Sequence, residues 1–230
     1  MSIKFTLLGA GSSMGVPHAN GFFGKCDPKN IKNFRTRCSA LISTNYSNTL
    51  IDTSPDLRAQ SLAQNIKQID RVLYTHMHAD QTHGINDLRI FYLKNKKKIP
   101  VFADKRTIEY LQKNFSYCFK KEYDYPPMLS VRLLKKNFII NDGNNKIKIS
   151  SIPVKHGQID SIAFIVNNKL AYVSDANKFY DKDIKYFKKL KYLVIDCLRI
   201  KSHPAHFNLS NVLQHVLFLK PKKIHLKLKV

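Results

Sequence analysis

The sequence lacks the features that would mark a membrane protein or a secreted one. No continuous apolar stretch approaches the roughly 20 residues that a membrane-spanning helix needs, and the N-terminus, "MSIKFTLLG", does not have the charged and then apolar layout of a signal peptide. The four cysteines lie far apart without a C-x-x-C pair, which argues against a disulfide framework and against a cysteine zinc site. We therefore expect a soluble, cytoplasmic protein in a reducing compartment, with no membrane as partner.

Acidic residues are also scarce. The chain has 16 Asp and Glu residues against 39 Lys and Arg residues, which gives a formal net charge of +23. Such an excess ordinarily indicates nucleic acid or another polyanion as partner. The lysines are scattered in short runs, however, and the abundance of Asn and Ile indicates a codon bias as readily as a selected binding face. A solvated lysine-rich surface is the preferred interpretation, and in either case its field attracts anions such as a phosphorylated substrate.

The hydrophobic pattern favours one α/β domain over residues 1–230. With 43% hydrophobic residues, the chain can bury a full core. Runs rich in β-branched and large apolar residues predict strands at 3–9, 38–44, 48–54, 70–75, 99–104, 147–154, 161–166, 170–175, 191–196 and 222–228. Helices are predicted between them at 54–66, with Ser54 as N-cap and Pro55 in the first turn, and at 85–94, 106–115, 181–190 and 208–219. Strands interspersed with helices favour a sandwich of two mixed sheets with outer helices.

The stretch "YTHMHADQTHGINDLR" (74–89) gathers metal-binding side chains in one loop. His76, His78 and Asp80 occupy alternate positions, and alternate residues of an extended segment point the same way. Imidazole and carboxylate are ligands of first-row divalent metals, and three protein ligands with an open water position are typical of a catalytic site. His156 and Asp175 each follow another predicted strand, where further ligands are expected.

A structural role is the alternative for each isolated residue of these types. A lone histidine at a strand end is commonly a hydrogen-bonded structural residue, and an aspartate after a strand commonly forms a turn or caps a helix. This interpretation is preferred for four histidines, and it stays open for three aspartates. They are His18, His83, His215 and His225, and Asp52, Asp87 and Asp175.

An ordered set of motifs resembles one family over most of the chain. "THMHADQTHG" is similar to the H-x-H-x-D-H motif of metallo-β-lactamase-fold hydrolases. Further segments resemble, in order, the phosphodiesterase-like branch, which includes phosphoribosyl cyclic phosphate phosphodiesterases and, more distantly, RNase Z. They are "LLGAGSSMGVP" (7–17), "RCSALI" (37–42), "LIDTSPDLR" (50–58), "HGINDLR" (83–89), "PVKHGQ" (153–158), "YVSDAN" (172–177), and "DCLR" followed by "HPAHFNL" (196–209).

The resemblance implies an αββα sandwich with a dinuclear metal site at one edge of the sheets. His76, His78 and His156 would bind one metal, Asp175 would bridge the two ions, and Asp80 would bind the second. Two cations that bridge a hydroxide lower its pKa, bind the phosphate oxygens and stabilise the charge on the leaving oxygen.

The resemblance also places His206 near the substrate, where it contacts phosphate or protonates a leaving group. Asp80 and His206 are the expected catalytic residues. Alternatively, Pro204 makes "SHPAH" a rigid turn with surface histidines. Ser12 and Ser13, in the "GAGSS" loop after the first strand, are expected to bring hydroxyls or backbone N–H groups to the substrate.

Two departures from the family pattern concern the second metal. Gln81 stands where the motif has histidine, and its amide oxygen is a neutral, weaker ligand that suits Mn²⁺ or Mg²⁺ better than Zn²⁺. The usual histidine after the last strand is also missing, because His225 lies a few residues too early, and the domain looks shortened at its C-terminus. We expect one tight site for Zn or Mn and a weak second site that includes Gln81.

Three functions remain open at this point. The preferred one is a metal-dependent phosphodiesterase that acts on a small cyclic or nucleotide-like phosphate ester. The first alternative is a degenerate member of the fold that acts as a binding protein or is a remnant. An RNA nuclease is less favoured, because no insertion looks like an arm that grips folded RNA and the lysines form no stripe with aromatic residues. The sequence does not decide the oligomeric state, and a homodimer stays open.

Overall fold

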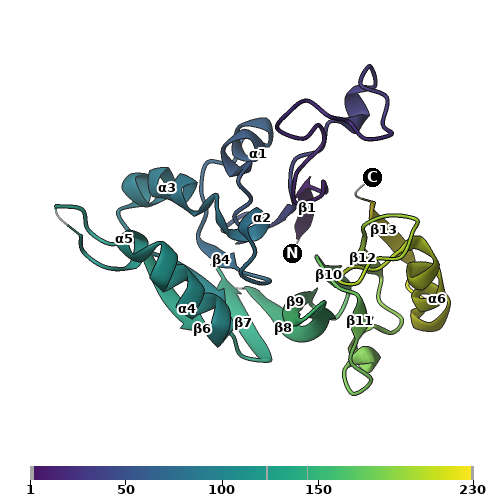
Figure 1. The fold of residues 1–230 in the computed structure, drawn as a ribbon. Helices are drawn as coiled ribbons and strands as arrows, with labels where there is room; N and C mark the ends of the chain where they lie inside the picture. The colour runs from purple at the N-terminus through teal and green to yellow at the C-terminus, as the bar shows by residue number, and fades with distance from the viewer. Residues whose placement is uncertain (1–2, 123, 144, 229–230) are drawn as a thin grey trace. The chain divides into compact units, whose positions relative to one another are not determined.

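The computed structural model describes residues 3–122, 124–143 and 145–228, and the chain forms two compact units. The first unit consists of Met1–Phe23 with Asp27–Leu134, and the second of Gly24–Cys26 with Lys135–Val230. Each unit contains one mixed β-sheet and one buried apolar cluster. Figure 1 labels the elements of both units.

The first unit has a six-stranded sheet in the order β1-β2-β3-β4-β5-β6. Strands β1, β2 and β3 pair antiparallel, whereas β3, β4, β5 and β6 pair parallel. Apolar residues such as Leu50 and Val101 are fully buried on these strands, as their β propensity and hydrophobicity predict. The strands are β1 (Lys4–Gly9), β2 (Ser39–Ser43), β3 (Asn48–Ile51), β4 (Arg71–Leu73), β5 (Ile99–Ala103) and β6 (Leu129–Leu133).

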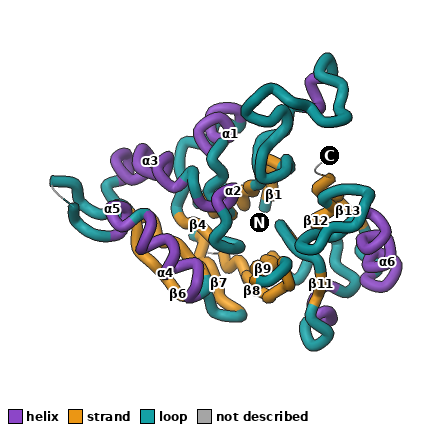
Figure 2. The backbone as a smooth tube through the Cα atoms, in the orientation of Figure 1, coloured by secondary structure: helices purple, strands orange, loops and turns teal. Residues whose placement is uncertain are grey.

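Short helices connect and cover these strands. Asp104 caps α4 by accepting a hydrogen bond from Thr107 N at 2.9 Å, and α4 and α5 pack against β6. The chain between β1 and β2 is mostly loop with one short helical turn, η1 (Figure 2). The helices of the first unit are η1 (Ile31–Asn33), α1 (Leu57–Ala63), α2 (Ala79–Thr82), η2 (Ile85–Asp87), α3 (Leu88–Asn95), α4 (Lys105–Asn114) and α5 (Ser116–Phe119).

The second unit has a seven-stranded sheet in the order β11-β8-β9-β10-β12-β13, with β7 paired to β8. The pairs that involve β7, β8, β9 and β11 are antiparallel, whereas β10, β12 and β13 run parallel. Parallel strands end at the same edge of a sheet, so residues at the carboxyl ends of β10, β12 and β13 lie near one another. The strands are β7 (Asn137–Asp142), β8 (Asn145–His156), β9 (Ile159–Val166), β10 (Leu170–Val173), β11 (Lys178–Phe179), β12 (Tyr192–Cys197) and β13 (Lys223–Leu228).

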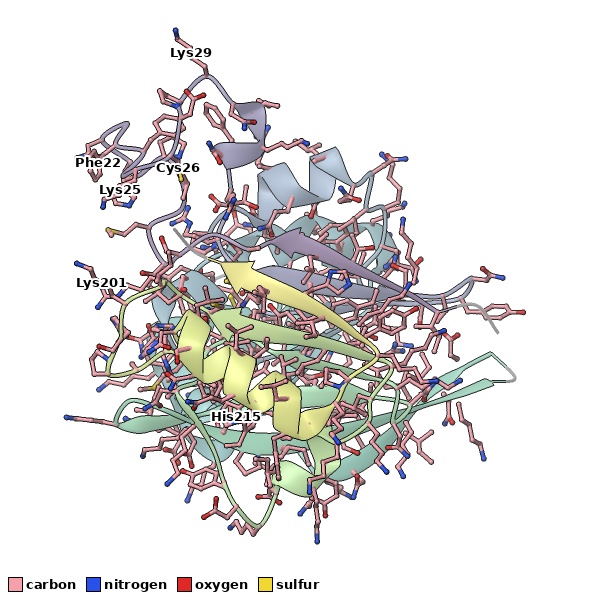
Figure 3. The ribbon with its side chains drawn as sticks, turned by 90° about the vertical axis from the view of Figure 1, so that its right-hand side faces the viewer. Phe22, Lys25, Cys26, Lys29, Lys201 and His215 are labelled. Carbon is pink, nitrogen blue, oxygen red and sulfur yellow. The ribbon has the colours of Figure 1, made fainter. Side chains whose placement is uncertain are left out.

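One α-helix, α6 (Leu209–Leu219), packs against β12 in the second unit. Asn208 caps it by accepting a hydrogen bond from Asn211 N at 2.9 Å. His215, labelled on α6 in Figure 3, meets the rings of Phe179 and Phe207 at centroid distances of 4.9 and 5.0 Å. Burial lowers the pKa of His215. These contacts agree with packing in the apolar cluster of this unit, and the structural role of His215 stays a prediction.

The lysine excess lies mainly on the surface. Lys29 in the first unit and Lys201 in the second are exposed and extend outward (Figure 3). Lys227 differs, because it is the one lysine among the described residues that is fully buried. No helix in residues 3–122, 124–143 and 145–228 is long and apolar enough to cross a membrane.

The predicted α/β fold with two mixed sheets and recurring helices is confirmed, but two helix predictions are wrong in extent. The helix predicted from Ser54 begins at Leu57, because the Ser54 carbonyl and hydroxyl accept hydrogen bonds from Leu57 N and Asp56 N and form a turn there. The helix predicted over 181–190 is a single short turn, η3 (Ile184–Phe187). Lys189 has a left-handed φ of 56°, which ends any helix at that point.

Candidate metal centre

The loop after β4 brings two histidine rings together in the first unit. Asp52 accepts hydrogen bonds from the backbone N and the hydroxyl of Thr75, at 2.7 and 2.9 Å. Because that hydroxyl proton goes to Asp52, the oxygen of Thr75 accepts from His76 Nδ1 at 3.0 Å. His76 Nε2 then faces His78 Nδ1 at 3.0 Å. Two ring nitrogens that can each bind a metal therefore converge in this loop.

Asp80 follows in the first turn of α2 and is buried. Gln81 Nε2 donates a hydrogen bond to Asp80 Oδ2 at 3.1 Å. The guanidinium of Arg37 is bound to Asp56, and this hydrogen bond raises the pKa of Arg37, with a smaller contribution from the charge of Asp80. Asp80 therefore experiences the positive charge of Arg37, whose position is fixed by Asp56. The prediction that Gln81 itself binds metal stays a prediction, while its amide supports the carboxylate beside it.

Backbone hydrogen bonds hold this loop to the end of β3. Thr53 N donates to the Gln81 carbonyl at 2.7 Å, and the Thr53 hydroxyl donates to the Thr82 carbonyl at 2.9 Å. Gly84 N in turn donates to the Thr53 carbonyl at 2.9 Å. A Cβ on Gly84 would lie 1.9 Å from the Ser54 carbonyl oxygen. Glycine is thus required here by close approach of two backbone segments.

Three side chains of types that can bind a metal gather in the second unit. His156 ends β8, Asp175 follows β10, and His206 precedes α6. Their candidate ligand atoms, one from each residue, all lie within 4.8 Å of one another. His156 and Asp175 are buried, and the rings of His156 and His206 meet edge to face at a centroid distance of 4.7 Å. His206, which was predicted beside the substrate, thus lies in the same cluster as two predicted metal ligands.

Hydrogen bonds fix the orientation of both imidazoles in this cluster. His156 Nδ1 lies 2.6 Å from the Ala205 carbonyl oxygen, which can only accept, so Nδ1 carries the proton. His206 Nδ1 lies 2.6 Å from Oδ2 of the fully buried Asp196 and donates to it. Both rings are therefore held through the same nitrogen, Nδ1. Histidines that bind metals characteristically have their second nitrogen held in this way.

The segment of residues 203–207 is tightly attached to the turn after β8. Asn177 joins the two by accepting from Gly157 N at 3.0 Å and donating to the Pro204 carbonyl at 2.9 Å. Gly157 has a φ of 59°, and a Cβ there would lie 3.0 Å from the Ala205 Cβ. The prediction of a rigid turn at Pro204 and the placement of His206 at the site are therefore compatible.

The donor set of the second unit fits a divalent first-row metal. Imidazole nitrogen and carboxylate oxygen bind Zn²⁺ and Mn²⁺ at about 2.1 Å, so ligand atoms around one ion are roughly 3.4 Å apart. The observed separations of at most 4.8 Å need only small side-chain movements to reach this spacing. That His76 and His78 bind the same ion as His156 stays a prediction.

The predicted substrate loop lies at the end of β1 in the first unit. The Ser12 carbonyl accepts from Gly15 N at 2.9 Å, and Ser13 is exposed. A separate cavity of about 660 Å³ lies along α1 and α3 of the same unit, where Leu62 and Ile90 contribute apolar surface. None of the predicted site residues lines this cavity, so it gives no support to Ser12 and Ser13 as substrate ligands.

Sequence reasoning missed three residues that support the two clusters. Asp196 stood in the quoted motif "DCLR", which was a usable signal for a functional carboxylate. Thr75 precedes His76 directly and links it to Asp52, a residue for which only a turn or cap was proposed. Lys227 gave no signal, because it is one lysine in a chain with 39 Lys and Arg residues.

The family model of the β-lactamase superfamily domain matches residues 47–226. The chain therefore belongs to the β-lactamase superfamily, and the predicted resemblance to the metallo-β-lactamase fold is confirmed. A solved diphosphatase of the PhnP family is similar, with 29% identity, a TM-score of 0.85, and coverage of 98% of this chain and 85% of that chain. Human tRNase Z, short form, has 14% identity and a TM-score of 0.71, and the match covers 98% of this chain and 92% of that chain.

A curated relative extends beyond this domain. An octanoyltransferase from Porphyromonas gingivalis is 28% identical over 217 residues, which cover 93% of this chain and 43% of that protein. The chain thus spans less than half the length of this relative.

Proposed function

We propose that this chain is a metal-dependent hydrolase that cleaves a phosphodiester or diphosphate bond in a small cyclic or nucleotide-like substrate. The observation that carries the proposal is the cluster of His156, Asp175 and His206, whose candidate ligand atoms lie within 4.8 Å of one another and whose two imidazoles are each held at Nδ1. The similarity to a PhnP-family diphosphatase supports a phosphate ester as the substrate class. The net charge of +23 would favour capture of such an anion.

His156 and Asp175, together with His76 and His78, are the proposed metal ligands, and Asp80 is proposed to hold a further ion or water. A bound divalent ion would activate water and neutralise phosphate charge. The chain's own contribution is orientation, because the Ala205 carbonyl and Thr75 each fix one ring. His206 belongs to the same cluster as His156 and Asp175. Because its Nδ1 donates to Asp196, Nε2 is the ring nitrogen that would contact a phosphate oxygen or the leaving oxygen.

Asp196→Asn is expected to lower turnover by about tenfold to a hundredfold. The amide oxygen can keep the hydrogen bonds from His206 Nδ1 and Ala176 N, but the negative charge beside the His206 ring is lost. Steady-state kinetics on a phosphodiester gives the measurement. Asp181→Asn is the control, because Asp181 is an exposed carboxylate of the same unit. Equal turnover of the two variants would leave Asp196 without a role in the reaction.

Substrate class is tested with a panel at fixed metal concentration. We expect hydrolysis of bis(p-nitrophenyl) phosphate, a 2′,3′-cyclic nucleotide or a dinucleoside diphosphate in preference to a β-lactam, and weaker substrate capture as salt rises, because salt screens the positive surface. The ratio of kcat/KM values gives the preference. A β-lactam turned over faster than every phosphate ester would remove the proposed substrate class.

The octanoyltransferase relative favours a second candidate, the cleavage of an acyl ester or thioester. An octanoyl thioester belongs in the panel for this reason, and preference for it over all phosphate esters would support this candidate. A degenerate binding protein would show no hydrolysis at any metal concentration. A nuclease would cleave folded RNA faster than small esters, and nucleic acid stays a less favoured partner.

A further inference from the structure

A fully buried lysine lies against one of the proposed metal ligands in the second unit. Lys227 Nζ lies 4.0 Å from Asp175 Oδ1, and both side chains are almost completely inaccessible. It donates hydrogen bonds to the carbonyl and the hydroxyl of Ser174, each at 3.0 Å. The ring centroid of Tyr172 lies 5.1 Å from the same ammonium. A buried ammonium persists only where such partners replace water.

The register of three parallel strands brings Lys227 to this position. Strand β13 pairs with β12 so that Lys227 lies opposite Asp196, and β12 pairs with β10, which leads directly into Ser174 and Asp175. His225 is two residues earlier on β13 and is exposed. His225 lies too early to replace the missing histidine, and Lys227 is the residue of this strand that reaches Asp175.

The charges around Asp175 fit one divalent ion but not a second one bridged by the same carboxylate. One ion is accommodated beside His156 and Asp175, whose candidate ligand atoms lie within 4.8 Å of each other. A second ion on Asp175 would lie within a few ångströms of the Lys227 ammonium, and like charges at that distance in a buried site repel strongly. Lys227 already neutralises the carboxylate on that side, as a second cation would.

We infer that the Lys227 ammonium takes the place of a second metal ion and that the centre binds a single divalent cation. The inference rests on the proposed function only in taking His156 and Asp175 as metal ligands. It changes the expectation from the sequence, which was one tight site and one weak second site. With Lys227 present, the second site stays empty even at millimolar Mn²⁺.

The test measures metal binding without substrate. Wild type and Lys227→Met are titrated with Mn²⁺ and with Zn²⁺ by calorimetry, and bound metal is counted after gel filtration. Wild type should hold one ion per chain up to millimolar Mn²⁺. Lys227→Met removes the charge at similar length, and it should take up a second equivalent and bind the first about tenfold more tightly or better. Lys223→Met, an exposed lysine on the same face of β13, should behave as wild type.

Several outcomes would overturn the inference. If the wild-type protein holds two ions or none, the inference is wrong, and this result does not depend on any variant. A Lys227→Met protein that binds one ion as tightly as wild type, or more weakly, means that the ammonium only orients Asp175. Circular dichroism checks that this variant is folded, and if it is not, the wild-type count alone decides. The proposed function can fail separately. If the wild-type protein binds one ion tightly but hydrolyses no ester, the proposed function is wrong and the inference of a single metal ion still holds.

Discussion

His156→Ala is expected to weaken metal binding by roughly a hundredfold or more and to abolish hydrolysis. The substitution removes a buried imidazole whose Nε2 is directed at the ligand cluster, and a loss of about 3 kcal/mol of ligand energy corresponds to that factor in affinity. The dissociation constant for Zn²⁺ or Mn²⁺, and the metal content after dialysis, are the measurements. Unchanged metal content would remove His156 from the metal ligands.

Two further variants sharpen this test. His225→Ala removes an exposed histidine of the same unit and should leave both measurements at wild-type values. His78→Ala alters the cluster of the first unit, and it should cause the same loss as His156→Ala if both clusters bind one ion. A loss in only one of the two variants would contradict a shared centre. Because the His78 side chain is exposed, its variant should keep the wild-type fold.

Gly84→Ala is expected to destabilise the protein by about 3 kcal/mol or more. The new Cβ would lie 1.9 Å from the Ser54 carbonyl oxygen and 3.1 Å from the Leu57 Cβ. No flexible side chain can move to relieve the first contact, so the backbone of the loop that carries His76, His78 and Asp80 has to shift. Thermal unfolding should show a midpoint lower by roughly 10 °C for a chain of this size.

Gly21→Ala is the matched control for the same change of residue. Gly21 has a φ of 81°, so alanine there is strained, but a Cβ would meet no atom within 4 Å. Its cost should stay near 1 kcal/mol, the usual penalty of a left-handed alanine. Equal unfolding midpoints for the two variants would mean that the loop at Gly84 moves freely away from Ser54.

Local patterns predicted most strands because these strands are apolar and buried. The prediction missed β6 and β7, where exposed residues interrupt the apolar pattern, and also the two-residue strand β11. On β6, for example, Arg132 and Leu133 are exposed. The pairing of β6 with β5 supplies hydrogen bonds that no local pattern reveals, because parallel partners are distant along the chain.

The candidate ligands were predictable from the chemistry of their side chains, whereas the residues that orient them were not. His156 and Asp175 followed predicted strands and stood in recognisable motifs. Asp196 and Lys227 become neighbours only through the register of β12 and β13, which the sequence does not specify. A lysine expected on the surface by hydropathy is buried here, because Ser174 and Asp175 supply its polar partners.

The attachment of residues 203–207 to the turn after β8 limits how this protein can evolve. The carbonyl that orients His156 belongs to Ala205, the residue directly before His206. A Cβ at Gly157 would lie 3.0 Å from the Ala205 Cβ, so little space remains between these two residues. A substitution at either position is therefore expected to disturb the rings of His156 and His206 together. In a library of random variants, functional clones should retain small residues at both positions and vary more freely elsewhere.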